Sequence, residues 1–272
     1  MLASSSMSAV HATATEMFTE VATADVEAAG LAIAAAVVVL GAVLRIRGDR
    51  AGATIFSALG YAFAVLVLAL AVHSNGWLTG ADAAVAQWFV DHRSHALSEW
   101  ATAVTTAGGP AETAALGLVV AVIQVWRTKR YGPALVMLVT VGSASMLCAI
   151  LKLIVGRERP PQSIQLMVET DASFPSGHVT GTAALLMMLA LMAGARRSKA
   201  VRTLLLGIAV AVTVVVACTR MYLGVHWLTD VCAGALLAAC AVTLGGYVLH
   251  RLDEPTVTES TPPRLLVNQI PL

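Results

Sequence analysis

Seven apolar runs constrain the fold of this chain more than any other feature. They cover about residues 28–44, 52–72, 110–126, 131–153, 178–195, 203–219 and 230–249. Each approaches the ~20 residues that a helix needs to cross a bilayer, and irregular backbone cannot face lipid because its polar groups would lack partners. Charged residues make up only 12% of the 272 positions, against about 25% in soluble domains. The sequence therefore predicts an all-α fold, a polytopic membrane helical bundle.

The segments outside these runs predict one membrane domain between two tails. Residues 1–27 are expected to form an extracytoplasmic N-terminal tail, residues 28–250 the membrane domain, and residues 251–272 a flexible cytoplasmic tail. A secretory signal begins with a basic region, whereas the first 26 residues contain no Lys or Arg. We therefore expect the first apolar run to stay in the protein as an uncleaved span.

Residues 79–100 lie between the second and third apolar runs and have a mixed character. Thr79 and Asp82 have the spacing expected of a helix capping box. Trp88, Phe89 and Trp100 then fall near one helical face, which is typical of a helix that lies in the plane of the membrane interface. The sequence predicts one interfacial helix here, and a plain extramembrane loop is the alternative.

Basic residues are distributed unevenly between the two sides that seven alternating spans would create. One side collects Arg45, Arg47, Arg50, Arg127, Lys129, Arg130, Arg196, Arg197, Lys199, Arg202, Arg251 and Arg264, and the other only Arg93, Lys152, Arg157, Arg159 and Arg220. Because Lys and Arg are enriched in cytoplasmic loops, the first side is predicted to be cytoplasmic. The protein is thus expected in the cell membrane, with its other side extracytoplasmic. A net charge of +1 gives no indication of a nucleic-acid partner.

Three polar segments on the extracytoplasmic side carry the residues that suggest chemistry. The first contains Lys152, near the end of an apolar run, and then Arg159-Pro160. A cation in the middle of a membrane helix costs about 2.5–3.5 kcal/mol, and less near an end, so it usually has a function or a partner. Lys152 and Arg159 would share a helical face if the helix continued to the Pro160-Pro161 stop. Snorkelling of Lys152 to the interface is the alternative.

The second polar segment, Pro175-Ser176-Gly177-His178, comes directly before an apolar run. Ser176 is of a type that caps helices, and the free N–H groups of a helix start bind anions. Gly177 would let an anion approach the backbone closely, and His178 could donate a proton there. A purely structural helix start is the alternative for this motif taken alone.

The third polar segment carries Arg220, His226 and Asp230. His226 and Asp230 are four residues apart and would share a face on a helix. Asp230 could then hold one ring nitrogen of His226 and leave the other free to attack. A metal site or a buried pair explains this spacing equally well. Taken together, Lys152, Arg159 and Arg220 suit the equatorial oxygens of a phosphoryl group.

In this order the three segments resemble the signature of the type 2 phosphatidic acid phosphatase superfamily. The matching pattern is Lys152, six residues, Arg159-Pro160; then Pro175-Ser176-Gly177-His178; then Arg220, five residues, His226, three residues, Asp230. The superfamily includes lipid phosphate phosphatases, bacterial polyprenyl diphosphate phosphatases and vanadium haloperoxidases. Its membrane members typically have six spans, which implies a phosphatase core at about 52–250 and one additional N-terminal span. Thr219 stands where the family usually has serine.

The resemblance implies a role for each motif residue. His226 would be the nucleophile that forms a phosphohistidine, Asp230 would orient it, and His178 would protonate the leaving oxygen. The phosphoryl oxygens would be held by Lys152, Arg159, Ser176, Gly177 and Arg220. No metal or other cofactor is implied, because cations of the protein neutralise the phosphoryl charge.

Together these features favour a metal-independent membrane lipid phosphatase that acts on an anionic lipid phosphate. The favoured substrate is a polyprenyl diphosphate, a carrier lipid that finishes its work outside the cytoplasm, with phosphatidic acid and phosphatidylglycerol phosphate as alternatives. A lipid phosphotransferase with the same intermediate and a non-enzymatic lipid-phosphate transporter or binding protein remain open, as does the oligomeric state. The four cysteines lie in or at the ends of apolar runs and are expected to be core residues.

Overall fold

The computed structural model describes the backbone of residues 2–253 and the side chains of residues 24–253. In this part of the chain all regular secondary structure is helical, which confirms the predicted fold class. The predicted C-terminal tail lies outside the described residues from position 254 onward. The elements are α1 (Leu2–Ile46), α2 (Arg50–Ser74), the 3-10 turn η1 (Trp77–Thr79), α3 (Gly80–Asp91), α4 (His95–Ala107), α5 (Pro110–Thr128), α6 (Tyr131–Val155), the 3-10 turn η2 (Gln162–Ile164), α7 (Gly177–Gly194), α8 (Lys199–Tyr222) and α9 (Leu228–Asp253).

Seven of the described helices are long and apolar enough to cross a membrane, as the sequence predicted. They are α2, α5, α6, α7, α8, α9 and the Ala24–Ile46 part of α1. Helix α7 lies at the centre of the bundle, against α5, α6, α8 and α9. The space between α6, α7 and α9 is filled by buried side chains that are mostly small or flexible, such as Met137, Ala184, Met188 and Ala238. Small residues let membrane helices approach closely, where lipid offers no hydrophobic drive for association.

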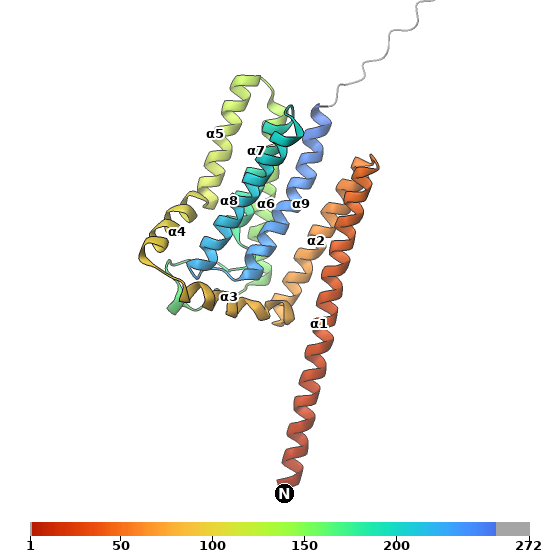
Figure 1. Ribbon diagram of the computed structural model, residues 1–272, viewed down its shortest axis with the longest axis vertical. Helices are drawn as coiled ribbons and strands as arrows, with labels where there is room; N and C mark the ends of the chain where they lie inside the picture. Colours follow the sequence, from red (N-terminus) through yellow and green to blue (C-terminus); the bar gives the residue numbers. More distant parts are fainter. Residues whose placement is uncertain (1, 254–272) are drawn as a thin grey trace, which may run out of the picture.

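The connections between the spans gather at two ends of the bundle (Figure 1). The α1–α2, α5–α6 and α7–α8 turns lie at one end, and α3, α4 and the α6–α7 and α8–α9 connections lie at the other. A hydrogen bond of 2.9 Å from Leu166 N to the carbonyl of Leu223 joins these last two connections. The three polar segments therefore meet at one end, opposite the connections that carry most of the basic residues.

Helix α6 ends at Val155, close to the predicted end of this apolar run at about 153. Gly156 has a left-handed conformation with φ of 60°, and its N–H donates to the carbonyl of Lys152 at 3.0 Å. Glycine suits this position because it has no Cβ. The helix thus stops before Pro160, and Arg159 lies in the connection. The condition under which Lys152 and Arg159 would share a helical face is therefore not met.

The segment at 79–100 is helical, but it forms two helices, α3 and α4, instead of one. Ser94 is the N-cap of α4, and the hydroxyl of Tyr222 accepts its N–H at 3.0 Å. The Arg93 guanidinium donates to the carbonyls of Ile164 at 2.7 Å and Tyr222 at 2.8 Å. These contacts attach the chain between α3 and α4 to the bundle. They join residues far apart in the sequence, so helical periodicity could not predict where the helix is interrupted.

The capping box expected at the start of α3 does not form. The Thr79 hydroxyl donates to the carbonyl of Gly76 at 2.7 Å. The Asp82 carboxylate is buried and accepts the N–H of Thr229 at 2.9 Å. Asp82 therefore connects α3 with the start of α9 instead of capping its own helix.

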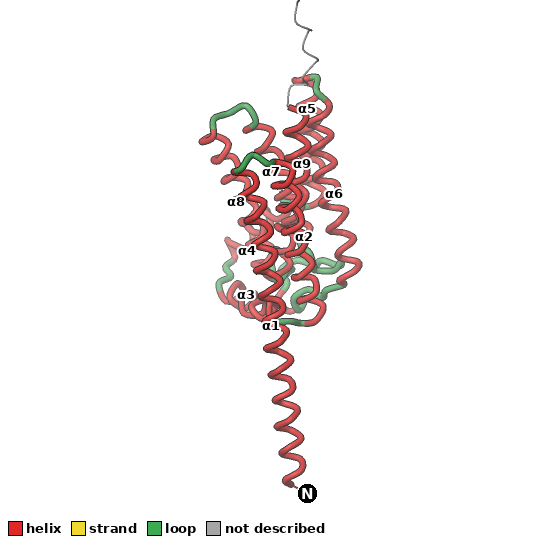
Figure 2. Tube along the Cα trace, turned by 90° about the vertical axis from the view of Figure 1, so that its right-hand side faces the viewer, coloured by secondary structure: helices red, strands yellow, loops and turns green. Residues whose placement is uncertain are grey.

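Helix α1 lies on the outer side of α2 and extends beyond the bundle toward the N-terminus (Figures 1 and 2). The two helices are close enough that a Cβ at Gly60 would lie 2.9 Å from the carbonyl oxygen of Ala34. The buried Glu27 carboxylate accepts the N–H of Leu78, in η1, at 2.8 Å. The additional N-terminal span is thus a peripheral helix that packs on α2 and η1.

Candidate active site

His226 and Asp230 meet, although not on a continuous helix as the sequence predicted. His226 lies in the connection between α8 and α9, where Gly224 has φ of 70° and turns the chain. His226 Nδ1 lies 3.3 Å from Asp230 Oδ2. The same oxygen accepts the N–H of Trp227 at 2.9 Å. The pair is therefore formed by a turn that leads into the first turn of α9.

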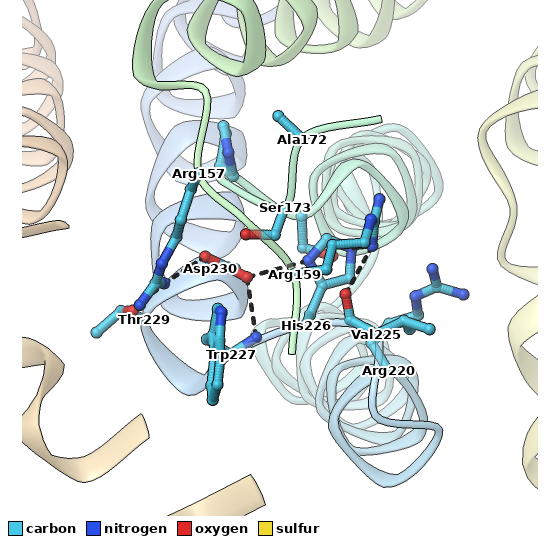
Figure 3. A network of polar contacts seen from close by, with 12 residues as sticks. Arg157, Arg159, Ala172, Ser173, Arg220, Val225, His226, Trp227, Thr229 and Asp230 are labelled. Carbon is cyan, nitrogen blue, oxygen red and sulfur yellow. Dashed lines mark hydrogen bonds and ion pairs between the residues drawn. The ribbon is translucent and has the colours of Figure 1, made fainter. Parts of the chain in front are cut away.

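The other ring nitrogen of His226 faces the guanidinium of Arg159 (Figure 3). The distance from Arg159 NH1 to His226 Nε2 is 3.3 Å. A guanidinium can only donate, so Nε2 accepts and Nδ1 carries the proton toward Asp230. Burial lowers the pKa of His226 to about 4, with Arg220 and Arg159 adding to the effect and Asp230 opposing it. At neutral pH His226 is thus uncharged, with the Nε2 lone pair directed at a cation.

The three predicted phosphate-binding cations lie at this same end of the bundle. Lys152 is in the last turn of α6, and Arg220 is in the last turn of α8, where it is fully buried. Arg159 belongs to the α6–α7 connection and donates to the carbonyl of Val225 at 2.6 Å, directly before His226 (Figure 3). The fold therefore brings together cations that are up to 68 positions apart, counting from 152 to 220.

Each of these cations is paired with a carboxylate from the α6–α7 connection. Asp171 accepts from Lys152 Nζ at 3.0 Å and from Arg159 NH2 at 2.5 Å. Glu169 accepts from Arg220 NH2 at 2.5 Å. Burial alone would raise the pKa of Asp171, but its contacts with Lys152 and Arg159 outweigh that effect and lower the pKa to about 2. The motif pattern assigned no role to either carboxylate.

The segment of Ser176, Gly177 and His178 begins α7, with Ser176 at the N-cap. Its side chain does not cap the helix as expected. Ser176 Oγ is buried and has no hydrogen-bond partner among the described residues. A Cβ at Gly177 would lie 4.0 Å from Lys152 Cε, so the start of α7 lies beside that lysine. The free N–H groups of this first turn and the Ser176 hydroxyl can therefore bind an anion there.

His178 lies in the first turn of α7 and is half-buried. Its charge would interact with those of His226, Arg220, Arg159 and Lys152, which places it near the same group. No hydrogen bond joins His178 to His226 in the described part of the chain. The structure thus brings all the predicted residues to one end of the bundle without linking the two histidines directly.

Sequence reasoning missed two residues that support Asp230. Arg157 NH1 donates to Asp230 Oδ1 at 2.6 Å (Figure 3). Arg157 NH2 donates to Asp82 Oδ2 at 2.5 Å. The Thr229 hydroxyl also donates to Asp82, at 2.7 Å. Asp230 is therefore held on one oxygen by His226 and on the other by Arg157. The signal that could have found Arg157 and Asp82 is that charged residues beside apolar runs need partners when buried.

These features define a polytopic helical membrane protein with two histidines and three cations gathered at one end of its bundle. The model of the PAP2 superfamily matches residues 133–253, a range that contains all three polar segments. Phosphatidylglycerophosphatase B of Bacillus subtilis (strain 168) is 31% identical over 171 residues, which are 62% of this chain and 83% of that protein. The chain belongs to the PAP2 superfamily, as the motif resemblance implied.

Two solved structures were also matched. The crystal structure of a transmembrane PAP2 type phosphatidylglycerolphosphate phosphatase from Bacillus subtilis matches with a TM-score of 0.64 and 28% sequence identity, over 69% of this chain and 93% of that one. The structure of Aquifex aeolicus LpxE matches with a TM-score of 0.48 and 18% identity, over 61% of this chain and 95% of that one. The first of these likenesses confirms the multi-pass helical fold.

Proposed function

We propose that the protein is a membrane lipid phosphatase that hydrolyses a phosphomonoester or diphosphate headgroup through a phosphohistidine on His226. The observation that carries this proposal is the position of His226 Nε2, which lies 3.3 Å from Arg159 while Asp230 holds the other side of the ring. A lipid-phosphate transporter or binding protein would need the cations but no positioned nucleophile. Membership of the PAP2 superfamily supports hydrolysis of phosphate esters.

The proposed reaction has two steps. First, His226 Nε2 attacks phosphorus, the N–P bond forms as the P–O bond to the lipid breaks, and His178 gives a proton to the departing oxygen. Then His178 takes a proton from water, the water oxygen attacks phosphorus, and the N–P bond breaks to release phosphate. The cations, the Ser176 hydroxyl and the first N–H groups of α7 would stabilise the phosphoryl oxygens in both steps. Because the protein supplies this positive charge itself, the reaction needs no metal.

Two headgroups are candidates for the substrate. Phosphatidylglycerol phosphate comes first, because a similar sequence and a similar solved structure, both from Bacillus subtilis, are named for its hydrolysis. Polyprenyl diphosphate, which the sequence favoured, comes second, because the positive-inside rule supports an extracytoplasmic site, where such carrier lipids end their work. Trp88 on α3 and Trp100 on α4 are exposed at the same end as the site. Aromatic residues of this kind sit at headgroup depth, which supports entrance from the membrane interface.

Phosphate release from a panel of substrates tests the proposal. Purified protein in detergent is given phosphatidylglycerol phosphate, a polyprenyl diphosphate, phosphatidic acid and a water-soluble phosphomonoester, with His226→Ala as the inactive control. We expect the lipids to have the higher kcat/KM, and a preference above about tenfold, equivalent to roughly 1.4 kcal/mol, decides between the two candidates. Highest activity on the soluble ester would contradict a lipid phosphatase. Transfer of the phosphoryl group to a second lipid without phosphate release would identify the phosphotransferase alternative.

A further inference from the structure

Two carboxylates of one short segment occupy all three cations that the proposed function assigns to the headgroup. Asp171 bridges Lys152 at 3.0 Å and Arg159 at 2.5 Å, and Glu169 binds Arg220 at 2.5 Å. Carboxylate and phosphoryl oxygens accept the same kind of charge-assisted hydrogen bond. A bound headgroup and these carboxylates therefore compete for the same N–H donors.

The same segment stands between the outside and the nucleophile. A polar hollow of about 480 Å³ opens at this end of the bundle, lined by residues of the 156–172 connection that include Glu169 and Asp171. His226 does not line the hollow, and only 2% of its surface is exposed. Met167 extends the cover, because its Sδ lies 3.4 Å from Arg220 NH1. A headgroup that takes the N–H donors of these cations must therefore displace the carboxylates.

This exchange conserves charge for one class of headgroup only. The two carboxylates carry two negative charges against three cations. A phosphomonoester carries about −1.5 to −2 at pH 7 and replaces that charge, whereas a phosphodiester carries a single negative charge. Arg220 is fully buried and the Arg159 side chain is 7% exposed, so water solvates neither charge well. Leaving such a buried charge without a partner is strongly unfavourable.

We propose that Glu169 and Asp171 determine the substrate class by standing in for the phosphoryl oxygens. They give way to a phosphomonoester or diphosphate headgroup, which carries about two negative charges or more, and exclude the monoanionic phosphodiester headgroups of ordinary phospholipids. This proposal rests on the proposed function, because it takes the three cations as the headgroup site. Neither carboxylate takes part in the reaction; both act through the cations.

The double variant Glu169→Gln/Asp171→Asn tests this proposal, because it keeps the shape of both side chains and removes their charges. Inhibition by phosphatidylglycerol, a phosphodiester lipid, and by inorganic phosphate is measured against turnover of phosphatidic acid in detergent. We expect the inhibition constant of phosphatidylglycerol to fall at least tenfold, that of phosphate to fall less, and the KM to fall. The matched control is Glu158→Gln in the same connection. Glu158 is exposed and forms no ion pair with the described cations, so both inhibition constants should stay unchanged.

An increase in the inhibition constants and in the KM of the double variant would overturn the proposal. If the carboxylates instead hold the cations in place for the substrate, the folded double variant will bind both inhibitors more weakly and its KM will rise. Unchanged inhibition in a variant that elutes as a single species would also contradict the exchange.

A second measurement needs neither the double variant nor turnover. Met167→Cys, with the four native cysteines replaced by alanine, is labelled with a water-soluble maleimide. Millimolar inorganic phosphate should raise the labelling rate several-fold, because the anion displaces the segment from Arg220. No increase would contradict the exchange. Because this readout uses phosphate alone, an increase without turnover of any lipid would reject the proposed function and leave the exchange supported.

Discussion

The Asp230 carboxylate sets the chemistry of the site at the scale of single residues. One oxygen accepts from His226 at 3.3 Å and from Trp227 N at 2.9 Å, and the other accepts from Arg157 at 2.6 Å. A carboxylate held on both oxygens cannot rotate, so the plane of the His226 ring is held with it. Asp82 fixes Arg157 in turn, at 2.5 Å. The position of Nε2 therefore depends on Arg157 and Asp82, which act through Asp230.

Arg157→Lys should separate positioning from binding. Lysine keeps the charge but cannot span Asp82 and Asp230 as the guanidinium does. We expect kcat to fall about 10- to 100-fold, because small displacements of a reacting group cost about that much. The KM should change less than about threefold, because the headgroup cations stay in place. Steady-state kinetics with a lipid phosphate checks this, and a variant with unchanged kcat would show that Arg157 does not position His226.

The low pKa of His226 predicts an unusual acid limb for the rate. Burial first, and then the charges of Arg220 and Arg159, lower this pKa from 6.5 to about 4. The nucleophile therefore loses its lone pair to a proton only as the pH falls toward 4. After correction for the second ionisation of the substrate phosphate, near pH 6, kcat/KM should stay level down to about pH 5 and fall below it. If the corrected kcat/KM instead begins to fall near pH 6.5, His226 is not held neutral by its surroundings.

The sequence was sufficient for the motif residues but not for their partners. Lys152 and Arg220 stand out because a cation at the end of an apolar run is costly and usually has a function or a partner. Arg157 and Asp82 are 75 positions apart, and only the fold, which places α3 beside the α6–α7 connection, brings them together. Thr219, where the family usually has serine, donates to the carbonyl of Val216 within α8 at 2.7 Å. Charged residues beside an apolar run could be predicted from the sequence because burying a charge is unfavourable. Residues whose role depends on a partner far away in the sequence could not.

At the scale of elements, apolar length predicted the spans well and their ends less well. Lipid imposes a length on every run, so the seven spanning helices follow from composition alone. The end of α6 at Gly156 depends on one left-handed residue. The break between α3 and α4 depends on Arg93 and Tyr222, which belong to different parts of the fold. Helix ends thus depend on single residues or on tertiary contacts, and the periodicity of apolar residues does not predict either.

The contact between α1 and α2 gives a prediction at this scale. A Cβ at Gly60 would lie 2.6 Å from Val38 Cγ2, closer than real side chains approach. Gly60→Leu should therefore destabilise the fold by about 1–3 kcal/mol through overpacking, and the melting temperature in detergent should fall. Gly142→Leu on α6 is the control, because nothing lies within 4 Å of a Cβ there. Equal melting temperatures for the two variants would mean that α1 does not pack on α2 through this glycine.

At the scale of the whole molecule, the site and the basic connections lie at opposite ends of the bundle. From this arrangement the positive-inside rule predicts that the site lies outside the cytoplasm. Val168→Cys (85% exposed in the wild type) should react with an impermeant thiol reagent added to intact cells. Ser198→Cys, in the α7–α8 turn, should react only after the membrane is opened. Both variants are made with the native cysteines replaced, and the reverse labelling pattern would invert the orientation.

The proposed nucleophile, His226, connects all three scales, because its Nε2 lies 3.3 Å from Arg159 and the turns and helices of the bundle bring Lys152 and Arg220 to the same end. The most direct measurement traps the phosphorylated protein. In His178→Ala the second step should be slow, because the group that activates water is missing. A radiolabelled phosphate ester with a good leaving group should therefore leave an intermediate that accumulates.

Rapid quenching into base, followed by peptide mapping, should place an acid-labile phosphate on His226, and the same label should be absent from the His178→Ala/His226→Ala protein. A label on any other residue, or phosphate release by His226→Ala at the wild-type rate, would contradict the proposed mechanism.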